Sequence, residues 1–142
     1  MIRLAPALVA VVLLCGCNAT GGGSSGTPLF NYVNDDLDQR SFSGQSLAGV
    51  SFAGSVADGA NFSNATLDGA SFDSAHAHRA NFIKASLKRA NLSNTDFTGS
   101  SMQGADLTGA RIDNARFNDA NLTGATWVDG KTCAAGSIGM CR

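Results

Sequence analysis

The stretch ADLTGARIDNARFNDANL, residues 105–122, repeats every five residues. Alanine occupies positions 105, 110, 115 and 120, and a large apolar residue follows two places after each alanine. An α-helix repeats at about 3.6 residues and a β-strand at about 2, so a period of five fits neither. The period therefore predicts a higher-order coil, in which each five-residue unit forms one side.

The same period runs from residue 40 to residue 127 without insertion or deletion. Its large apolar residue, here called the centre, recurs at every fifth position from Phe42 to Trp127, and only Ala57 and Ala77 are small. Two residues after the centre, at the position called the corner, Gly and Asn dominate. Both tolerate positive φ, so the pattern predicts a turn at each corner and centres that point inward.

The segments ANLSN (90–94), ADLTG (105–109) and ANLTG (120–124) resemble the motif of the pentapeptide repeat family. The resemblance covers residues 40–127 and implies an all-β fold, a right-handed quadrilateral β-helix with roughly 20 residues per coil and about 4.5 coils. Charged residues at this spacing support it. We expect contacts between coils within the pairs Asp58 with His78 and Asp68 with Lys88, and within the series His76, Asp96 and Arg116.

The N-terminal residues 1–16 have the layout of a secretory signal, with one arginine followed by an apolar run from Leu4 to Leu14. Leu14, Cys15, Gly16 and Cys17 resemble a bacterial lipobox, which implies a lipoprotein signal peptide and an acylated Cys17. Cys15 fits less well, because Leu14 would be bulky at its preceding position. An ordinary secreted protein with an incidental cysteine is the alternative.

Three further segments complete the predicted organisation. Residues 17–28 are rich in Gly and Ser and are predicted to be a flexible tether after the lipidated cysteine. Residues 29–39 are predicted to form an N-terminal cap, and residues 128–142 a C-terminal cap loop. In an exported chain Cys133 and Cys141 are an even pair, so we expect a disulfide that closes the C-terminal cap. The tail also resembles the cysteine-bearing tails of exported members of the family.

The formal net charge is −1, from 10 basic and 11 acidic residues. Such a balanced charge gives the chain no electrostatic preference for nucleic acid. The sequence shows no convergent acid, base and nucleophile, so we predict neither an enzyme nor a cofactor. His76 and His78 flank one centre and leave a surface metal site as a weak alternative.

Residues 76–89, HAHRANFIKASLKR, contain four basic residues and no acid. We call Arg79, Lys84, Lys88 and Arg89 the basic belt. One hypothesis is a contact for an anionic component of the cell envelope, because clustered cations on a rigid wall concentrate the electrostatic potential. The alternative is a solvated group of charges neutralised by nearby aspartates.

These features predict a non-catalytic lipoprotein of the bacterial cell envelope, inserted in a lipid bilayer through Cys17 and facing the periplasm. Its partner would be an envelope protein or an anionic polymer. Asn18, where aspartate would favour inner-membrane retention, favours the outer membrane. The resemblance also allows a DNA-mimicking, topoisomerase-protecting protein, but the export signal and the balanced charge disfavour that role.

Overall fold

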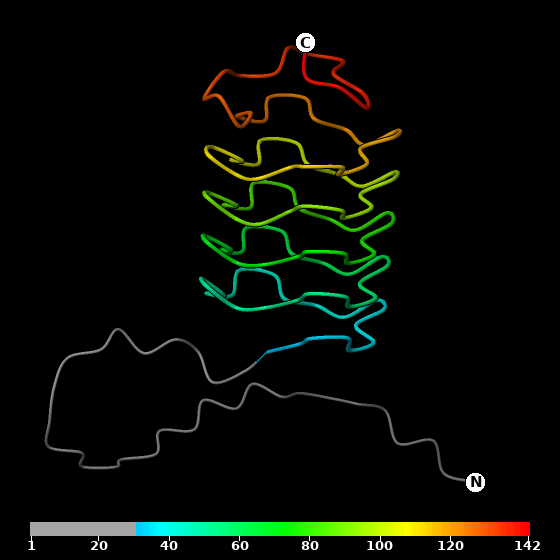
Figure 1. Cartoon of the computed structure of the whole chain (residues 1–142). Coiled ribbons are helices and arrows are strands. Elements are labelled where there is room, and N and C mark those ends of the chain that lie inside the picture. Colours follow the sequence, from blue (N-terminus) through cyan, green and yellow to red (C-terminus); the bar gives the residue numbers. More distant parts are fainter. Residues whose placement is uncertain (1–30) are drawn as a thin grey trace, which may run out of the picture.

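The computed structural model describes residues 31–142, which wind into a right-handed quadrilateral β-helix of stacked coils (Figure 1). Parallel bridges join residues 20 positions apart, at every fifth residue from Asp36–Val56 to Asp106–Thr126. Each coil therefore has four sides of five residues, which confirms the predicted fold and its 20-residue period. The predicted signal peptide, Cys17 and the tether lie outside the described residues.

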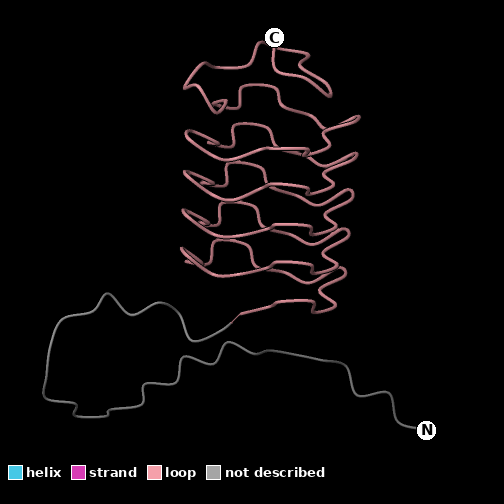
Figure 2. Cartoon of the chain, in the orientation of Figure 1, coloured by secondary structure: helices cyan, strands magenta, loops and turns pink. Residues whose placement is uncertain are grey.

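Residues 31–142 contain no helix and no extended strand, so Figure 2 draws them as loop. Each side has a single bridged residue, because the remaining positions belong to turns. The amide of Asn61 donates to the carbonyl of Arg40 in the preceding coil at 2.8 Å, and the amide of Phe62 donates to Asn81 in the next coil at 2.7 Å. Hydrogen bonds between coils thus replace the long ladders of an ordinary sheet.

Positive φ occurs at every fifth residue from Asn34 to Gly124, as predicted for the corners. A turn closes each corner, as where the amide of Ala65 donates to the carbonyl of Phe62 at 3.1 Å. Positive φ at the third residue of such a turn is characteristic of type II. Six corners carry a residue other than Gly or Asn: Gln39, Ser74, Arg79, Lys84, Arg89 and Asp119.

The residue before the centre explains why Asn and Asp recur in the motif. The side-chain oxygen of Asn81 accepts a hydrogen bond from the amide of Ile83 at 3.0 Å, and Asn61 does the same for Ser63. That amide follows the centre and has no backbone acceptor in these turns. Asn or Asp therefore completes the hydrogen bonding of the turn, in the manner of an Asx turn.

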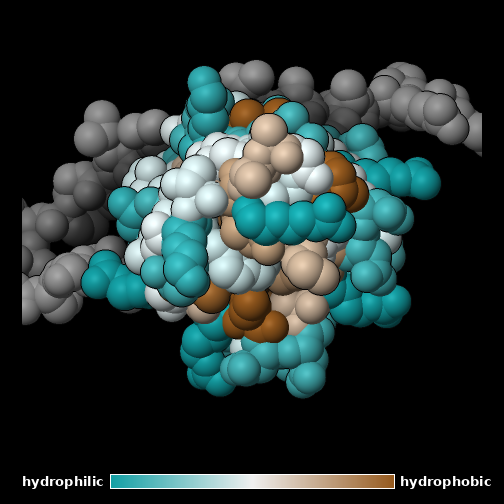
Figure 3. Space-filling view, turned by 90° about the horizontal axis from the view of Figure 1, so that it is seen from above, coloured by the Kyte–Doolittle hydropathy of each residue, from teal (hydrophilic) through white to brown (hydrophobic). Residues whose placement is uncertain are grey.

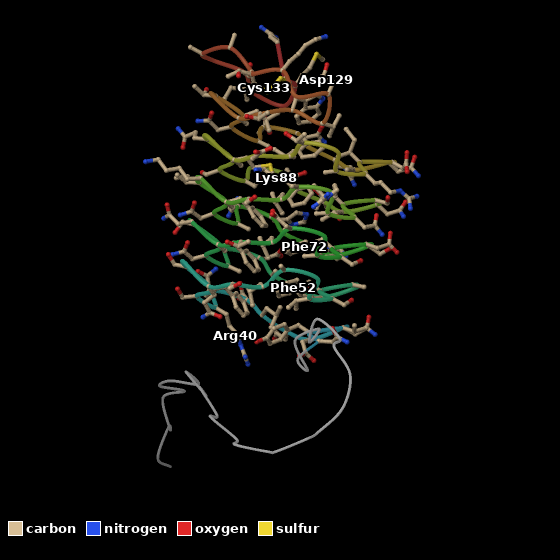
Figure 4. The ribbon with its side chains drawn as sticks, turned by 90° about the vertical axis from the view of Figure 1, so that its left-hand side faces the viewer. Arg40, Phe52, Phe72, Lys88, Asp129 and Cys133 are labelled. Carbon is tan, nitrogen blue, oxygen red and sulfur yellow. A yellow bond between two sulfur atoms is a disulfide. The ribbon has the colours of Figure 1, made fainter. Side chains whose placement is uncertain are left out.

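The core is a column of centres that are almost fully buried. Phe52 and Phe72 stack on one side, with ring centroids 4.7 Å apart, as Figure 4 shows. Phe62 and Phe82 stack on the opposite side at 4.9 Å, and their edges contact the first pair. The predicted inward orientation of the centres is confirmed for these residues.

The two small centres, Ala57 and Ala77, lie on the same side of the helix and are fully buried. Aromatic rings from the neighbouring sides meet edge to face beside them, as Phe52 does with Phe62 at 5.5 Å. Val56 does not fill this space, because it points outward and is 41% exposed. One coil later Phe97 occupies the alanine side, while Leu92 and Met102 replace the flanking phenylalanines, so the core volume is approximately conserved.

Residues 31–39 continue the helix instead of forming a separate cap. Asp36 bridges Val56, the amide of Leu37 donates to the carbonyl of Val56 at 2.7 Å, and Leu37 is fully buried. Tyr32 stacks on Phe52 with centroids 5.2 Å apart. The repeat therefore begins before residue 40. The predicted start at residue 40 is too late, because Tyr32 and Leu37 already occupy the five-residue register of Phe42.

The C-terminal cap, residues 128–142, reverses direction and covers part of the last coil. Antiparallel bridges join Thr126 to Thr132 and Asn121 to Ile138. The predicted disulfide between Cys133 and Cys141 is present, with Cα atoms 4.9 Å apart. The amide of Leu122 donates to the carbonyl of Ser137, and the amide of Gly124 donates to the carbonyl of Cys133. These cap carbonyls take the place of the acceptors that a further coil would supply. Within the part of the chain described, no helix has the length and hydropathy needed to cross a membrane.

Candidate interaction surface

The helix presents four flat side walls, and its aspartates are unevenly distributed among them. The wall built from 35–39, 55–59, 75–79, 95–99 and 115–119, here called the acidic face, carries six of the 11 acids. They are Asp35, Asp36, Asp38, Asp58, Asp96 and Asp119. The next wall, from 40–44, 60–64, 80–84, 100–104 and 120–124, contains none and is called the acid-free face.

A chain of ionic contacts runs along the acidic face across successive coils. His78 lies between two carboxylates, with Nδ1 3.6 Å from Asp58 and Nε2 3.1 Å from Asp96. Arg116 lies 3.5 Å from the same carboxylate of Asp96. The expected pairs Asp58 with His78 and Asp96 with Arg116 are therefore confirmed, whereas His78 takes the place predicted for His76 beside Asp96.

Asp96 is the most strongly perturbed carboxylate of this face. Burial raises its pKa, but hydrogen bonds from the hydroxyl and amide of Thr98 and from His78 outweigh burial, and the pKa falls to about 2. Its side chain is only 17% exposed. Asp96 is thus ionised over the whole range in which the fold is ordinarily studied, and it holds three consecutive coils together.

Lys88 does not pair with Asp68 as expected. Its ammonium lies 3.3 Å from Asp106, which is 18 residues later in the chain. Asp68 instead accepts the backbone amide of Lys88 at 3.2 Å and the hydroxyl of Ser86. Burial raises the pKa of Asp106, but Thr108 and Lys88 lower it more, so the net shift is downward.

The structure divides the basic belt into two kinds of residue. Lys88 follows a centre and is paired, whereas Arg79, Lys84 and Arg89 are corners with φ of 55°, 56° and 55°. None of these three corner residues forms an ion pair with another residue in 31–142. The register of the repeat accounts for this difference, because positions 79, 84 and 89 are corners and position 88 is not.

The aliphatic stem of each corner cation lies beside the glycine one coil above. A Cβ placed on Gly99, Gly104 or Gly109 would lie 3.5, 3.6 or 3.4 Å from Cγ of Arg79, Lys84 or Arg89, respectively. The stems therefore lie against the wall of the next coil, with their charged groups on the surface.

The weak metal hypothesis gains no support from the geometry. His76 and His78 are in edge contact, with ring centroids 5.8 Å apart, but both nitrogens of His78 face aspartates. Among residues 31–142 no group of three or more His, Cys, Asp or Glu side chains is arranged to hold a metal ion.

The C-terminal end, viewed in Figure 3, mixes a largely hydrophilic rim with small apolar patches. Met140 is 62% exposed and Ile138 is 48% exposed on the cap. A shallow depression here is lined by Trp127, Asp129, Lys131, Thr132, Cys141 and Arg142. Lys131 pairs with Asp129 at 3.1 Å, so this charge is already matched.

Comparison with protein families matches the pentapeptide repeats, in eight copies at residues 41–73, 78–112 and 100–126. These matches cover more than half of the chain. A comparison with curated proteins found no match.

Several solved structures are similar. A pentapeptide repeat protein from the Arabidopsis thaliana thylakoid lumen is 26% identical, with a TM-score of 0.44, over 84% of this chain and 90% of that one. A pentapeptide repeat protein from the cyanobacterium Cyanothece is 19% identical over 68% of this chain, with a TM-score of 0.36. One from Nostoc, described as involved in heterocyst differentiation regulation, is 22% identical over 72%, with a TM-score of 0.33. The chain spans 63% of each cyanobacterial protein, which is less than two thirds.

Proposed function

Because the chain belongs to the pentapeptide repeat family, whose members are generally structural or interaction modules, we propose that it is a non-catalytic, lipid-anchored interaction module of the bacterial cell envelope. The observation that carries this proposal is the lipobox-like sequence from Leu14 to Cys17, placed ahead of a tether and a rigid β-helix. Acylated Cys17 would insert in the lipid bilayer.

The physical design of the β-helix supports a binding role. Its centres fill the interior, and hydrogen bonds between coils use most of its backbone amides. The groups left to contact another molecule are therefore the side chains of the four walls and the two ends. Such a body presents fixed surface chemistry, which suits recognition of an extended partner.

The tether sets how far the β-helix stands from the membrane. A Gly- and Ser-rich segment as long as residues 17–28 has an average span of about 20 Å and a fully extended length of about 40 Å. The walls of the β-helix would thus sample the periplasmic layer next to the bilayer.

Inhibition of lipoprotein signal peptidase by globomycin tests the anchor directly. We expect an uncleaved, diacylglycerol-modified precursor to accumulate, and Cys17→Ser to abolish labelling with palmitate. Cys15→Ser is the matched control, and it should be processed and labelled normally. Cleavage and release that continue in the presence of globomycin would identify an ordinary secreted protein instead.

The membrane that carries the anchor is a separate question. Asn18 follows the acylated cysteine in this proposal, and we expect fractionation in the outer membrane. Asn18→Asp should shift the protein towards the inner membrane. Equal distribution of both forms would show that this position does not determine sorting here.

The role as a DNA mimic is the second candidate, and the acidic face is the feature that favours it. Asp96 of that face already pairs with Arg116 at 3.5 Å, which reduces the free negative charge. Recovery of the full-length chain only in the cytoplasm would favour this candidate over the envelope lipoprotein.

A further inference from the structure

Three consecutive corners carry a long basic side chain where the repeat favours Gly or Asn. Arg79, Lys84 and Arg89 adopt the left-handed conformation, which is unfavourable for residues with a branched or long side chain. Below them in the stack the corners are Gly59, Asn64 and Gly69, and above them Gly99, Gly104 and Gly109. Residues that break a local rule and persist in a strained conformation are a reason to look for function.

Charge pairing within the described β-helix does not account for these cations. The small corners above and below offer no carboxylate, and none of the three cations has an ion-pair partner within residues 31–142. Lys88 is different, because Asp106 neutralises it at 3.3 Å. The free positive charge of the basic belt is therefore concentrated at corners.

Arg79 and Lys84 are distinguished from Arg89 by the wall between them. They stand at the two edges of the acid-free face, on either side of the segment Ala80–Ile83. Arg89 borders the walls that contain Asp68, Asp106, Asp73 and Asp113. Arg79 and Lys84 are therefore the two cations of this group that stand on either side of a wall without acids. Asp119 is the nearest acid along the corner of Arg79, two coils above it and about 10 Å away.

The acid-free face itself is rich in neutral hydrogen-bonding groups. Arg40 is exposed at the start of this wall, in the first coil. Between the corners, the other outward positions apart from Ile83 hold only hydroxyl and amide side chains, namely Ser41, Ser43, Asn61, Ser63, Asn81, Ser101, Gln103, Asn121 and Thr123. These groups donate and accept hydrogen bonds, as sugar hydroxyls do. A flat hydrogen-bonding wall with a cation at each edge matches a ligand with many hydroxyls and a few negative charges.

We propose that the acid-free face binds an anionic polysaccharide, with Arg79 and Lys84 contacting its carboxylate or phosphate groups and the wall contacting its hydroxyls. Arg79 can donate two parallel hydrogen bonds to one anionic group, whereas Lys84 acts as a point charge. This deepens the proposed function by naming a partner class. The polysaccharide proposal rests on the proposed function only for the compartment, the cell envelope, in which the chain would encounter the polymer. The binding chemistry is argued from the geometry of the wall alone.

Glycine substitutions at the corners provide the test, because glycine is the residue that most corners already carry. Arg79→Gly and Lys84→Gly remove a charge without disturbing positive φ, and Arg89→Gly is the control with the same change at a corner outside the face. The purified full chain with Cys17→Ser, which cannot carry the acyl anchor, and its corner variants are titrated with alginate, with dextran as the uncharged polymer, and with phosphatidylglycerol vesicles. Melting temperatures not below that of the parent establish that each variant is folded.

We expect binding to alginate that weakens with salt and no binding to dextran. Arg79→Gly and Lys84→Gly should each reduce the affinity by about two- to fivefold, while Arg89→Gly changes it less than twofold. An equal loss in all three variants would overturn the proposal, because it would indicate a non-specific charge effect. Loss of vesicle binding without loss of alginate binding in the Arg79 and Lys84 variants would also overturn it, in favour of a membrane surface. Failure to bind alginate would reject the polysaccharide site. The lipid anchor is tested separately, by globomycin treatment.

Discussion

Nε2 of His78 lies 3.1 Å from a carboxylate oxygen of Asp96, which is 18 residues later in the chain and one coil higher. Residues in strictly equivalent positions are 20 apart, so this contact crosses diagonally between two positions of the repeat. The imidazole reaches the carboxylate because His78 follows a centre whereas Asp96 precedes one. Lys88 and Asp106 repeat this relationship on another wall.

The pKa of Asp96 predicts a specific acid sensitivity. Because the pKa is lower in the folded protein, at about 2, than the usual value of about 3.9, ionised Asp96 stabilises the fold at every pH above that usual value. The stabilisation, about 1 to 2 kcal/mol, is lost as the pH falls from about 4 to 2. Denaturant unfolding of the Asp96→Asn variant should show a weaker dependence on pH in this range than the parent.

Asp113→Asn is the control for that experiment, because its pair with Arg111 is highly exposed, with 71% of the Asp113 side chain accessible. As the pH falls from about 4 to 2, the free energy of unfolding should decrease by the same amount in the parent and in this control. A parallel loss in Asp96→Asn as well would show that Asp96 has no role in the acid response.

The buried centres predict large losses of stability on truncation. Phe82 and Leu107 are fully buried, and replacing either with alanine leaves a cavity between adjacent coils. We expect Phe82→Ala and Leu107→Ala each to reduce the free energy of unfolding by about 2 to 5 kcal/mol. Ile83→Ala, next to Phe82 but directed outward, should cost less than about 1 kcal/mol. Thermal melts that rank Ile83→Ala as the most damaging would reverse the inward assignment.

Much of this architecture is predictable because each residue has the same role in every coil. The centres, the corners and the disulfide follow from period, residue size and cysteine count. The partner of Lys88 does not follow, because a long flexible side chain reaches diagonally to Asp106 instead of to Asp68. The start of the helix was predicted too late, although Leu37 is five residues before Phe42 and so continues the period, because the neighbouring apolar residues Tyr32 and Val33 suggested a separate cap. The position of Arg79 and Lys84 at the two edges of the acid-free face became evident only when the residues of all four walls were compared.

Asn81 provides a test of the residue before the centre. Its side chain accepts the amide of Ile83 at 3.0 Å, so Asn81→Ala should destabilise the protein by about 0.5 to 1.5 kcal/mol. Asn81→Asp retains an acceptor at the same place and should cost less. Equal losses in the two variants, measured by chemical denaturation, would show that the carboxylate cannot replace the amide oxygen in this turn.

The cap protects one part of the upper edge of the helix and leaves another part open. The amides of Leu122 and Gly124 are bonded to carbonyls of the cap, at 2.8 and 3.0 Å. On the next wall, the amide of Trp127 is bonded to the carbonyl of Lys131 at 2.7 Å. On the two remaining walls, the amides of Ile112 and Phe117 have no backbone acceptor within residues 31–142. A row of unpaired amides is a template for pairing with another chain, so the cap limits the length of this edge.

Removal of the disulfide should therefore loosen the cap and lengthen the open edge. In the chain-entropy model, the loop closed by Cys133 and Cys141, which are eight residues apart, contributes about 2 to 3 kcal/mol. In the Cys133→Ser, Cys141→Ser variant we expect faster hydrogen exchange at Leu122 and Gly124, with unchanged exchange at Phe62 in a central coil, and concentration-dependent self-association by sedimentation. A cation at the exposed edge opposes such pairing, so adding Asn118→Lys, at an exposed outward position next to Phe117, should suppress the association. Unchanged exchange at Leu122 and Gly124 would show that the backbone bonds of the cap hold it in place without the disulfide.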